Sequence, residues 1–326
     1  MRVAILGAGG IAAKMARTIA GLDDVELYAI GSRDKEKAEA FAKKWNAAKA
    51  YGDYDEMLAD DSIDLVYIAV PHSHHHKWTM AALNAGRNVL CEKAFAANAK
   101  QAQEMIDLAE EKKLLLTEAI WTRYMPSRYI IDDIIGSGEI GEVRSVDANL
   151  GYRICMNDRL TNPALAGGCL LDLTVYPLNF SSMILGDEIE TINAHMIKTD
   201  TGVDGQDSVM LTYKTGAMAT MFTTMYTQTD RRGLICGEKA FISVQNINNP
   251  SRITIYEPGD EYKVIKEIAV PEQITGFEYE VLACKRALQE GKLQCDEMPH
   301  AETLEIMRQM DEIRNIYGIV YPFERE

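Results

Sequence analysis

The 326-residue sequence predicts two domains: an α/β domain with a doubly wound parallel sheet, and an α+β domain with a large, mostly antiparallel open sheet. Three observations predict this. Residues 1 to about 120 alternate apolar strands with helices, which is the order of βαβ units. After Trp121, strand-like segments follow one another with only turns between them. Two helical segments end the chain. We therefore expect domains at residues 1–121 and 122–326.

The first domain is expected to begin with a buried strand, because the apolar run Arg2–Leu6 ends at Gly7. Pro71 closes a later strand, and Gly86 is a helix-ending signal. The remaining expected strands are Val25–Ile30, Ile63–Val70, Asn88–Cys91 and Leu114–Glu118. The expected helices are Ile11–Ala20, Asp34–Trp45, His76–Ala85 and Ala99–Lys113.

The second domain is expected to open with a helix, Ser127–Ile135, and to end with the helices Phe277–Glu290 and Ala301–Tyr317. Met218–Tyr226 carries apolar and small residues on both faces, which predicts a strand buried on both sides. The expected strands are Val143–Leu150, Ile189–Lys198, Ser208–Tyr213, Ala217–Tyr226, Gly233–Gln245 and Arg252–Tyr256.

Charge and cysteine content exclude several classes of protein. The formal charge of −15, from 34 basic and 49 acidic residues, argues against nucleic acid or an anionic membrane as a partner. Six scattered cysteines without a C-x-x-C pair are typical of a reducing compartment. No apolar run approaches the roughly 20 residues of a membrane span. We therefore expect a cytoplasmic protein.

A glycine-rich turn follows the first strand. Gly7, Gly9, Gly10, Ile11 and Ala12 lie in a G-x-G-x-x-A pattern that opens a helix. Such glycines allow a tight turn and a close approach to a pyrophosphate, and the helix N-terminus supplies oriented N–H groups. The alternative is a glycine-rich turn without a ligand. Because the motif opens a βαβ pattern, it predicts a Rossmann domain that binds a dinucleotide.

The end of the second strand indicates which dinucleotide binds. Enzymes that use NAD usually place Asp or Glu there, against the ribose 2′-hydroxyl. This chain has Ser32 and Arg33 instead, which can bind a 2′-phosphate. The alternative is a solvated arginine beside Asp34 as a helix cap. We expect NADP(H) as the preferred cofactor, with NAD(H) also accommodated.

Three further segments carry a family resemblance. They are Ala85–Phe95 with Pro71 and His75 upstream, Thr117–Tyr124, and Gly167–Pro177. Together with the glycine turn they resemble the Gfo/Idh/MocA oxidoreductases, and most closely the branch of dimeric dihydrodiol dehydrogenases and NADP-dependent D-xylose dehydrogenases. The resemblance covers nearly the whole chain. It implies an enzyme, a dehydrogenase or reductase that acts on CH–OH groups of a sugar, polyol or dihydrodiol.

The resemblance also implies roles for individual residues. Lys93 corresponds to the motif lysine near nicotinamide and substrate, and Asp172 and Tyr176 to the acidic and proton-donating positions of a substrate-domain helix. Their i, i+4 spacing places the last two on one helical face. Residues that border the cofactor would include Pro71, His75 and Glu92. Residues that line the substrate pocket would be Trp121, Arg123 and Tyr124, for which interdomain packing is an equal alternative.

The chemistry of alcohol oxidation suggests how these residues act. A free tyrosine has a pKa near 10, and a neighbouring ammonium group stabilises its phenolate. We therefore hypothesise that Tyr176 donates and accepts the proton, that Lys93 assists, and that Asp172 orients substrate or Lys93. The alternatives are a surface Lys93 paired with Glu92, a packed aromatic ring at Tyr176, and a helix N-terminal charge at Asp172.

The chain departs from the family motif at one position. The family's Glu-Lys-Pro is Glu92-Lys93-Ala94 here, and a cis bond before alanine costs about 2.5–4 kcal/mol. Either this bond is trans, or the surrounding fold imposes a cis geometry. Ala94 also favours the alternative function, a catalytically weak regulator that binds NAD(P).

Two further expectations concern metals and assembly. The run His72–His76 has ligand-type residues at i and i+4, but no cysteine or acidic cluster accompanies it, so we expect no metal. The branch forms dimers through the sheet of the second domain. We therefore expect a homodimer with a small-molecule substrate as its other partner.

Overall fold

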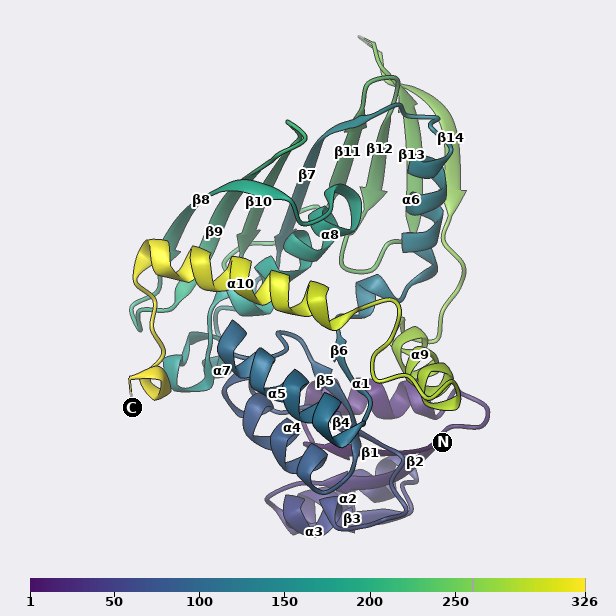
Figure 1. Cartoon of the computed structure of the whole chain (residues 1–326), viewed down its shortest axis with the longest axis vertical. Coiled ribbons are helices and arrows are strands. Elements are labelled where there is room, and N and C mark those ends of the chain that lie inside the picture. The colour runs from purple at the N-terminus through teal and green to yellow at the C-terminus, as the bar shows by residue number, and fades with distance from the viewer. Residues whose placement is uncertain (260, 326) are drawn as a thin grey trace. The chain divides into compact units, whose positions relative to one another are not determined.

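A computed structural model describes residues 1–259 and 261–325 of the chain (Figure 1). The chain divides into two compact units. The first unit comprises residues 1–121 and 273–304, and the second comprises residues 122–272 and 305–326. The first break after Trp121 coincides with the expected one. Residues 273–304 belong to the first unit, whereas the expected division of 1–121 and 122–326 places them in the second.

A parallel sheet forms the centre of the first unit, with the strand order β3-β2-β1-β4-β5-β6. β1, β4 and β5 are almost wholly buried, as expected for parallel strands covered on both faces. β3 was missed in the sequence because a strand of three residues has no readable periodicity. The strands are β1 (Arg2–Leu6), β2 (Glu26–Gly31), β3 (Lys49–Tyr51), β4 (Leu65–Ile68), β5 (Asn88–Glu92) and β6 (Leu116–Ala119).

Local capping determines where several helices of this unit begin and end. The Asp34 carboxylate accepts the N–H of Lys37, and Asn98 accepts the N–H of Gln101, so each caps a helix N-terminus. The helices are α1 (Gly10–Ile19), α2 (Lys35–Trp45), α3 (Tyr54–Leu58), η1 (His72–His74), α4 (His75–Asn84), α5 (Ala99–Lys112) and α9 (Glu278–Gln289). A short helical turn, η2 (Trp121–Arg123), lies at the break between the units.

Hydrogen bonds of the backbone and of two side chains hold residues 273–304 in the first unit. The N–H of Leu116, on β6, donates to the carbonyl of Leu293 at 3.0 Å. His300 Nε2 lies 2.8 Å from the carbonyl oxygen of Leu116. The buried Glu278 carboxylate accepts three consecutive backbone N–H groups, from residues 274–276, at 2.7–3.0 Å. The Glu278 contacts are local, whereas no sequence motif signals the two contacts of Leu116, because they join segments about 180 residues apart.

An eight-stranded sheet forms the second unit, in the order β14-β13-β12-β11-β7-β10-β9-β8. Only β7 and β10 pair in parallel, so the sheet is mostly antiparallel as expected (green strands, Figure 1). The expected strand Gly233–Gln245 is two strands, and β14 was missed because its side chains are nearly all exposed. The strands are β7 (Val143–Gly151), β8 (Ile189–Lys198), β9 (Asp204–Tyr213), β10 (Met218–Thr224), β11 (Gly233–Gly237), β12 (Phe241–Gln245), β13 (Arg252–Glu257) and β14 (Lys263–Ala269).

One face of this sheet packs against helices and the other stays open within the chain. β10 alternates buried and exposed residues, and Met218 and Phe222 are 40% and 38% exposed. Within the single chain one face of this strand is thus partly exposed, and its burial by a second subunit stays a prediction. The helices are α6 (Pro126–Gly136), α7 (Asp158–Thr161), η3 (Pro163–Leu165), η4 (Leu170–Thr174), α8 (Val175–Leu185) and η5 (Pro322–Glu324), with α10 (His300–Tyr317) crossing between the units.

One helical segment, Pro163–Leu185, is as long and apolar as a membrane span. The sequence analysis did not single it out, because polar residues interrupt its apolar run. Of its most apolar stretch, 78% is buried inside the protein. Its composition is thus that of a core helix, and its burial accounts for its apolar character.

Candidate active site

The glycine turn lies at the carboxyl end of β1. Gly7 has a φ of +123°, and a Cβ atom there would lie 2.4 Å from the carbonyl oxygen of Ala69, which follows β4. Only glycine meets both demands. β1 and β4 are also the strands at which the strand order reverses, and ligands of open α/β sheets bind at that place.

The N-terminus of α1 is open toward an anion. Its cap residue, Gly9, makes no side-chain hydrogen bond to the helix, and the first turn carries no acidic residue. Cβ atoms built at Gly9 and Gly10 would meet nothing within 4 Å, and the buried Ala12 lets the helix lie close to the sheet. Unused N–H groups beside free space suit a pyrophosphate, so these residues fit the dinucleotide.

The end of β2 lacks an acidic residue that faces a ribose. The Asp34 carboxylate is occupied as the cap of α2. The Oγ atom of the buried Ser32 accepts the Asp34 N–H at 3.2 Å, and its own hydrogen can still be donated. The Arg33 side chain is exposed. This arrangement suits a 2′-phosphate better than a 2′-hydroxyl.

His75 holds the loops that follow β4 and β5. Its Nδ1 lies 2.8 Å from the Ala94 carbonyl oxygen and its Nε2 2.8 Å from that of Val70. The ring is fully buried, and Pro71 precedes the helical turn η1 between the two loops. The Lys93–Ala94 peptide bond is cis, which is the second of the two alternatives for this motif.

Glu92, at the end of β5, accepts the Tyr67 hydroxyl through Oε1 and the Lys93 N–H through Oε2 at 3.2 Å. Lys93 therefore extends from the carboxyl edge of the same sheet as the glycine turn. The sequence analysis missed Lys14 and Glu280 in this region. Burial lowers the pKa of Lys14, against the opposing effect of Glu92 and Glu280, and burial raises the pKa of Glu280 well above its usual value.

Trp121 packs inside the first unit. Its ring lies 4.5 Å from the ring of Phe277, measured between centroids. The Lys14 ammonium lies 4.1 Å from the Trp121 ring centroid and 4.3 Å from that of Phe277. These are cation–π distances, so the aromatic pair stabilises a cation beside α1. No sequence signal identifies Lys14, because its partners lie more than 100 residues away.

Asp172 and Tyr176 lie on one continuous helical segment of the second unit. Asp172 is in η4, a π-helical turn, and Tyr176 is the second residue of α8. Such wide turns occur often at functional sites. The largely buried Asp172 carboxylate pairs with the Arg159 guanidinium at 3.0 Å, a partner that the sequence analysis did not identify.

Arg123 and Tyr124 are buried within the protein. Arg123 Nε donates to Asn179 Oδ1 at 2.5 Å and its NH2 group to Ser182 Oγ at 3.1 Å, so its guanidinium holds α8. These contacts give Arg123 a packing role within the second unit, and its expected place beside the substrate stays a prediction. The helix that carries Tyr176 is thereby fixed at its middle.

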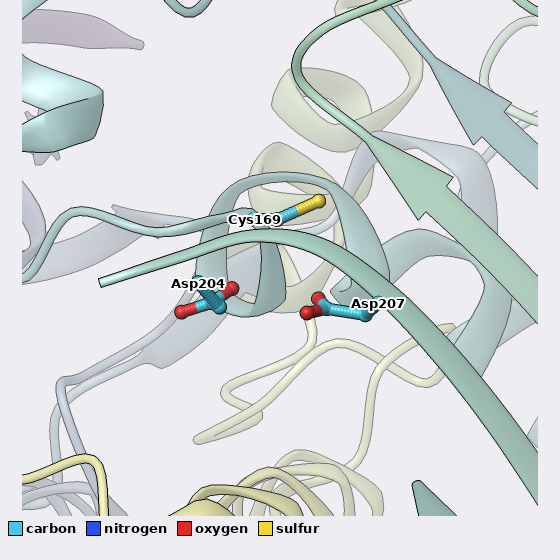
Figure 2. Close-up of side chains that lie close together, drawn as sticks. All are labelled: Cys169, Asp204 and Asp207. Atoms are coloured by element: carbon cyan, nitrogen blue, oxygen red, sulfur yellow. The ribbon is translucent and has the colours of Figure 1, made fainter. Parts of the chain in front are cut away.

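The histidines of the run His72–His76 contact different partners. His74 Nδ1 lies 2.8 Å from Ser73 Oγ, and His76 Nε2 lies 2.8 Å from Glu104 Oε2. Among the described residues, ligand-type side chains gather elsewhere: Cys169, Asp204 and Asp207 lie within 4.8 Å of one another (Figure 2).

Comparisons with known proteins agree with this arrangement. Residues 1–120 match the model of the oxidoreductase family with an NAD-binding Rossmann fold, and residues 130–243 match the GFO/IDH/MocA C-terminal domain. D-xylose 1-dehydrogenase (NADP(+)) of Hypocrea jecorina is 35% identical, over 98% of this chain and 92% of its own. Trans-1,2-dihydrobenzene-1,2-diol dehydrogenase of Mus musculus is 30% identical, over 100% and 99%.

A solved structure also superimposes over almost the full length. KijD10, a 3-ketoreductase from Actinomadura kijaniata in complex with NADP and TDP-benzene, is 25% identical with a TM-score of 0.87, covering 97% of both chains. The family match, the open glycine turn and the order of the two sheets lead to one conclusion: the chain belongs to the Gfo/Idh/MocA family of NAD(P)-dependent oxidoreductases.

Proposed function

We propose that this protein is an NADP(H)-dependent oxidoreductase that transfers a hydride between the nicotinamide and a hydroxyl or carbonyl carbon of a sugar, polyol or trans-dihydrodiol. The observation that carries the proposal is the open N-terminus of α1 beside Ser32 and Arg33, with no acid free for a ribose hydroxyl. The substrate class is supported by the sugar and dihydrodiol dehydrogenases that the chain resembles over its whole length.

The bound nicotinamide would supply the hydride chemistry, and the protein would supply placement and proton transfer. We assign the proton transfer to Tyr176: its hydroxyl gives a proton to the substrate oxygen during reduction and its phenolate takes one during oxidation. Lys93 would stabilise the phenolate and polarise the substrate oxygen. Tyr176 is held by a helix that Arg123 fixes, which supports a role that demands a fixed position.

Asp172 would bind a substrate hydroxyl or orient Lys93. Its carboxylate is largely buried and pairs with Arg159, which compensates its charge. A charged acceptor in such a place makes stronger hydrogen bonds than one in water. Vicinal hydroxyl groups are the substrate feature that such an acceptor would recognise.

We further propose that the protein works in the cytoplasm and as a homodimer through the open face of its eight-stranded sheet. All six cysteines are free thiols, which suits a reducing compartment. On the open face, the rings of Phe241 and Tyr256 stack at 5.0 Å, and Tyr262 is 71% exposed beside them. Exposed aromatic side chains on a sheet face are typical of a protein interface.

Cofactor preference and substrate class are tested in one assay series. Reduction of NADP⁺ and NAD⁺ is followed with pentoses, hexoses, inositols and trans-dihydrodiols. We expect turnover in at least one class, with a higher kcat/KM for NADP⁺. In Arg33→Ala the KM for NADP⁺ should rise about 10–100-fold, because a charge-assisted phosphate contact is lost. The KM for NAD⁺ should change little, and Lys43→Ala, at the far end of α2, is the control. No turnover with either cofactor would favour the regulatory alternative.

The glycine turn allows a variant that separates cofactor binding from folding. A methyl group at Gly9 meets no protein atom, so Gly9→Ala should keep the wild-type thermal stability. The same methyl group would occupy the space next to the pyrophosphate and weaken NADPH binding at least about tenfold. Fluorescence titration with NADPH measures the dissociation constant. Gly136→Ala, where a Cβ atom is equally unhindered, is the control. Unchanged NADPH affinity in Gly9→Ala would place the cofactor elsewhere.

The catalytic assignment is tested by Tyr176→Phe. Removal of the hydroxyl should lower kcat about 10²–10⁴-fold, the usual contribution of a general acid or base. The NADPH dissociation constant should stay the same, because that residue is not assigned to the cofactor. Tyr129→Phe, at a ring on α6 that is 51% exposed, is the matched control. Equal kcat in Tyr176→Phe and wild type would refute the assignment.

Sedimentation velocity tests the dimer. The wild-type protein should sediment as a dimer at micromolar concentration, and Phe222→Glu as a monomer, because a charge on the open face of β10 opposes its burial. Met156→Glu replaces an apolar side chain that is 89% exposed in a loop and should leave the dimer intact. A monomeric wild-type protein contradicts this assembly.

A further inference from the structure

Two fully buried carboxyl groups lie beneath the helical segment that carries Asp172 and Tyr176. They belong to Asp204 and Asp207, at the start of β9, and each is at most 1% exposed. Figure 2 shows the carboxyl group of Asp207 pointing toward Asp204. Neither residue has a role in the proposed reaction, and burial of two acids side by side requires an explanation.

Each acid holds one end of the π-helical turn η4. Asp204 Oδ2 accepts the N–H of Leu170, the first residue of the turn. Asp207 Oδ2 accepts the hydroxyl of Thr174, the last residue of the turn, at 2.7 Å. Asp172 lies between these two attachment points. The pair therefore fixes the backbone from which the Asp172 side chain extends, and the helix that Tyr176 begins.

The neighbouring backbone packs directly onto this pair. Gly168 has a φ of +127°, and a Cβ atom there would lie 2.3 Å from Asp204 Oδ1. The Oδ1 atoms of both acids are buried and, among the described residues, bond to no donor outside the pair. Each acid thus keeps one buried oxygen without a described donor, and the carboxyl group of the other acid is hydrogen-bonded beside it.

Among the residues that the structure describes, no cation is named among the main influences on the two acids. The groups that act most strongly on the two acids are backbone N–H groups, the Thr174 hydroxyl, the Cys169 thiol and the acids themselves. The buried Tyr321 also faces them, and Arg314, which stacks on Tyr321 at 4.8 Å, is paired with Glu324 and Asp311. Burial raises the pKa of both acids, and the neighbouring Asp204 raises that of Asp207 further.

We propose that Asp204 and Asp207 share a single proton, with Asp204 ionised and Asp207 protonated, and that this pair acts as a positioning device for Asp172 and Tyr176. Backbone N–H donors at the start of η4 favour the negative charge on Asp204. The proton on Asp207 then bridges the two Oδ1 atoms. The positioning role rests on the proposed function of Asp172 and Tyr176, whereas the shared proton does not.

A metal ion is the competing occupant of the same space. The Cys169 Sγ atom lies close enough to join the two acids as a ligand. However, its thiol lies 3.4 Å from the Thr223 hydroxyl, and burial raises the pKa of this thiol well above its usual value. A metal would have to displace the thiol proton and this hydrogen bond to Thr223, so we argue for the proton, and metal content is an outcome of the test.

The two isosteric variants should behave differently. In Asp207→Asn the amide N–H replaces the shared proton and the amide oxygen still accepts from Thr174, so kcat should stay within about twofold of wild type. In Asp204→Asn an N–H group competes with the backbone donors of η4. Its kcat should fall about 10–100-fold, because small displacements of reacting groups are costly. NADPH affinity should be unchanged in both variants, and Asp200→Asn, at an exposed acid, is the control.

The shared proton has a signature that a merely structural pair lacks. Unfolded aspartate ionises near pH 4, while folded Asp207 keeps its proton to higher pH. Unfolding therefore releases a proton, and the wild-type protein loses stability relative to Asp207→Asn as the pH rises above about 4. The ratio of their unfolding equilibrium constants should change by up to about tenfold per pH unit. The infrared difference spectrum between the two proteins should show the carbonyl band of a protonated carboxyl group.

A different result would overturn each part of the proposal. A parallel pH dependence of stability in wild type and Asp207→Asn, or no protonated-carboxyl band, excludes the shared proton. A stoichiometric metal by elemental analysis, lost in Asp207→Asn, assigns the space to a metal. Should Asp204→Asn fail to fold, Thr174→Val removes the other attachment of η4 and must lower kcat instead; unchanged kcat rejects the positioning role. If Tyr176→Phe retains full activity, the proposed function fails, while the infrared and stability results still decide the shared proton.

Discussion

The close approach of the Gly7 backbone to the carbonyl oxygen of Ala69 is the constraint on which the cofactor end of the first unit depends. It brings the ends of β1 and β4 together, and α1 starts directly above them with unused N–H groups. The other cofactor residues follow from the same sheet edge. Ser32 directly follows β2, and Glu92 ends β5, and both lie at this edge because parallel strands present all their carboxyl ends on one side. A side chain at Gly7 would push the ends of β1 and β4 apart and would displace the glycine turn as well.

The sequence alone predicts those parts of this arrangement whose residues lie close together in the chain. The glycine turn, the strand before it and the helix after it could be predicted because their signals lie within a dozen residues. Asp172 and Tyr176 were singled out by the family resemblance, and their expected place on one helical segment is confirmed, although the π-helical turn that contains Asp172 left no sequence signal. Nothing in the composition of Leu170–Thr174 distinguishes it from an α-helix. Its width depends on Asp204 and Asp207, more than 30 residues later.

The misassigned parts share a physical cause. β3 is too short for a periodicity, and β14 is an exposed edge strand whose side chains need no apolar alternation. The return of residues 273–304 to the first unit depends on hydrogen bonds of Leu293 and His300 to Leu116 on β6. The hydrogen bonds of Arg123 to Asn179 and Ser182 likewise arise only once the chain is folded. Long-range contacts of this kind leave no local pattern to interpret.

In both units, buried acidic side chains hold functional residues in place, but the negative charge of these acids is compensated differently. In the first unit, Glu92 is surrounded by a hydroxyl, a backbone N–H and the Lys14 ammonium, so an ionised carboxylate has partners of suitable charge. In the second unit, no such cation is found beside Asp204 and Asp207 among the described residues, and the shared proton compensates the charge instead. Pairing an acid with a buried lysine requires the desolvation of a second charged group, whereas a shared proton adds no second charged group. The second arrangement therefore suits a place that must stay rigid and dry, directly beneath the turn that carries Asp172. Its drawback is that the proton can be lost at high pH, which makes the geometry of the turn sensitive to pH.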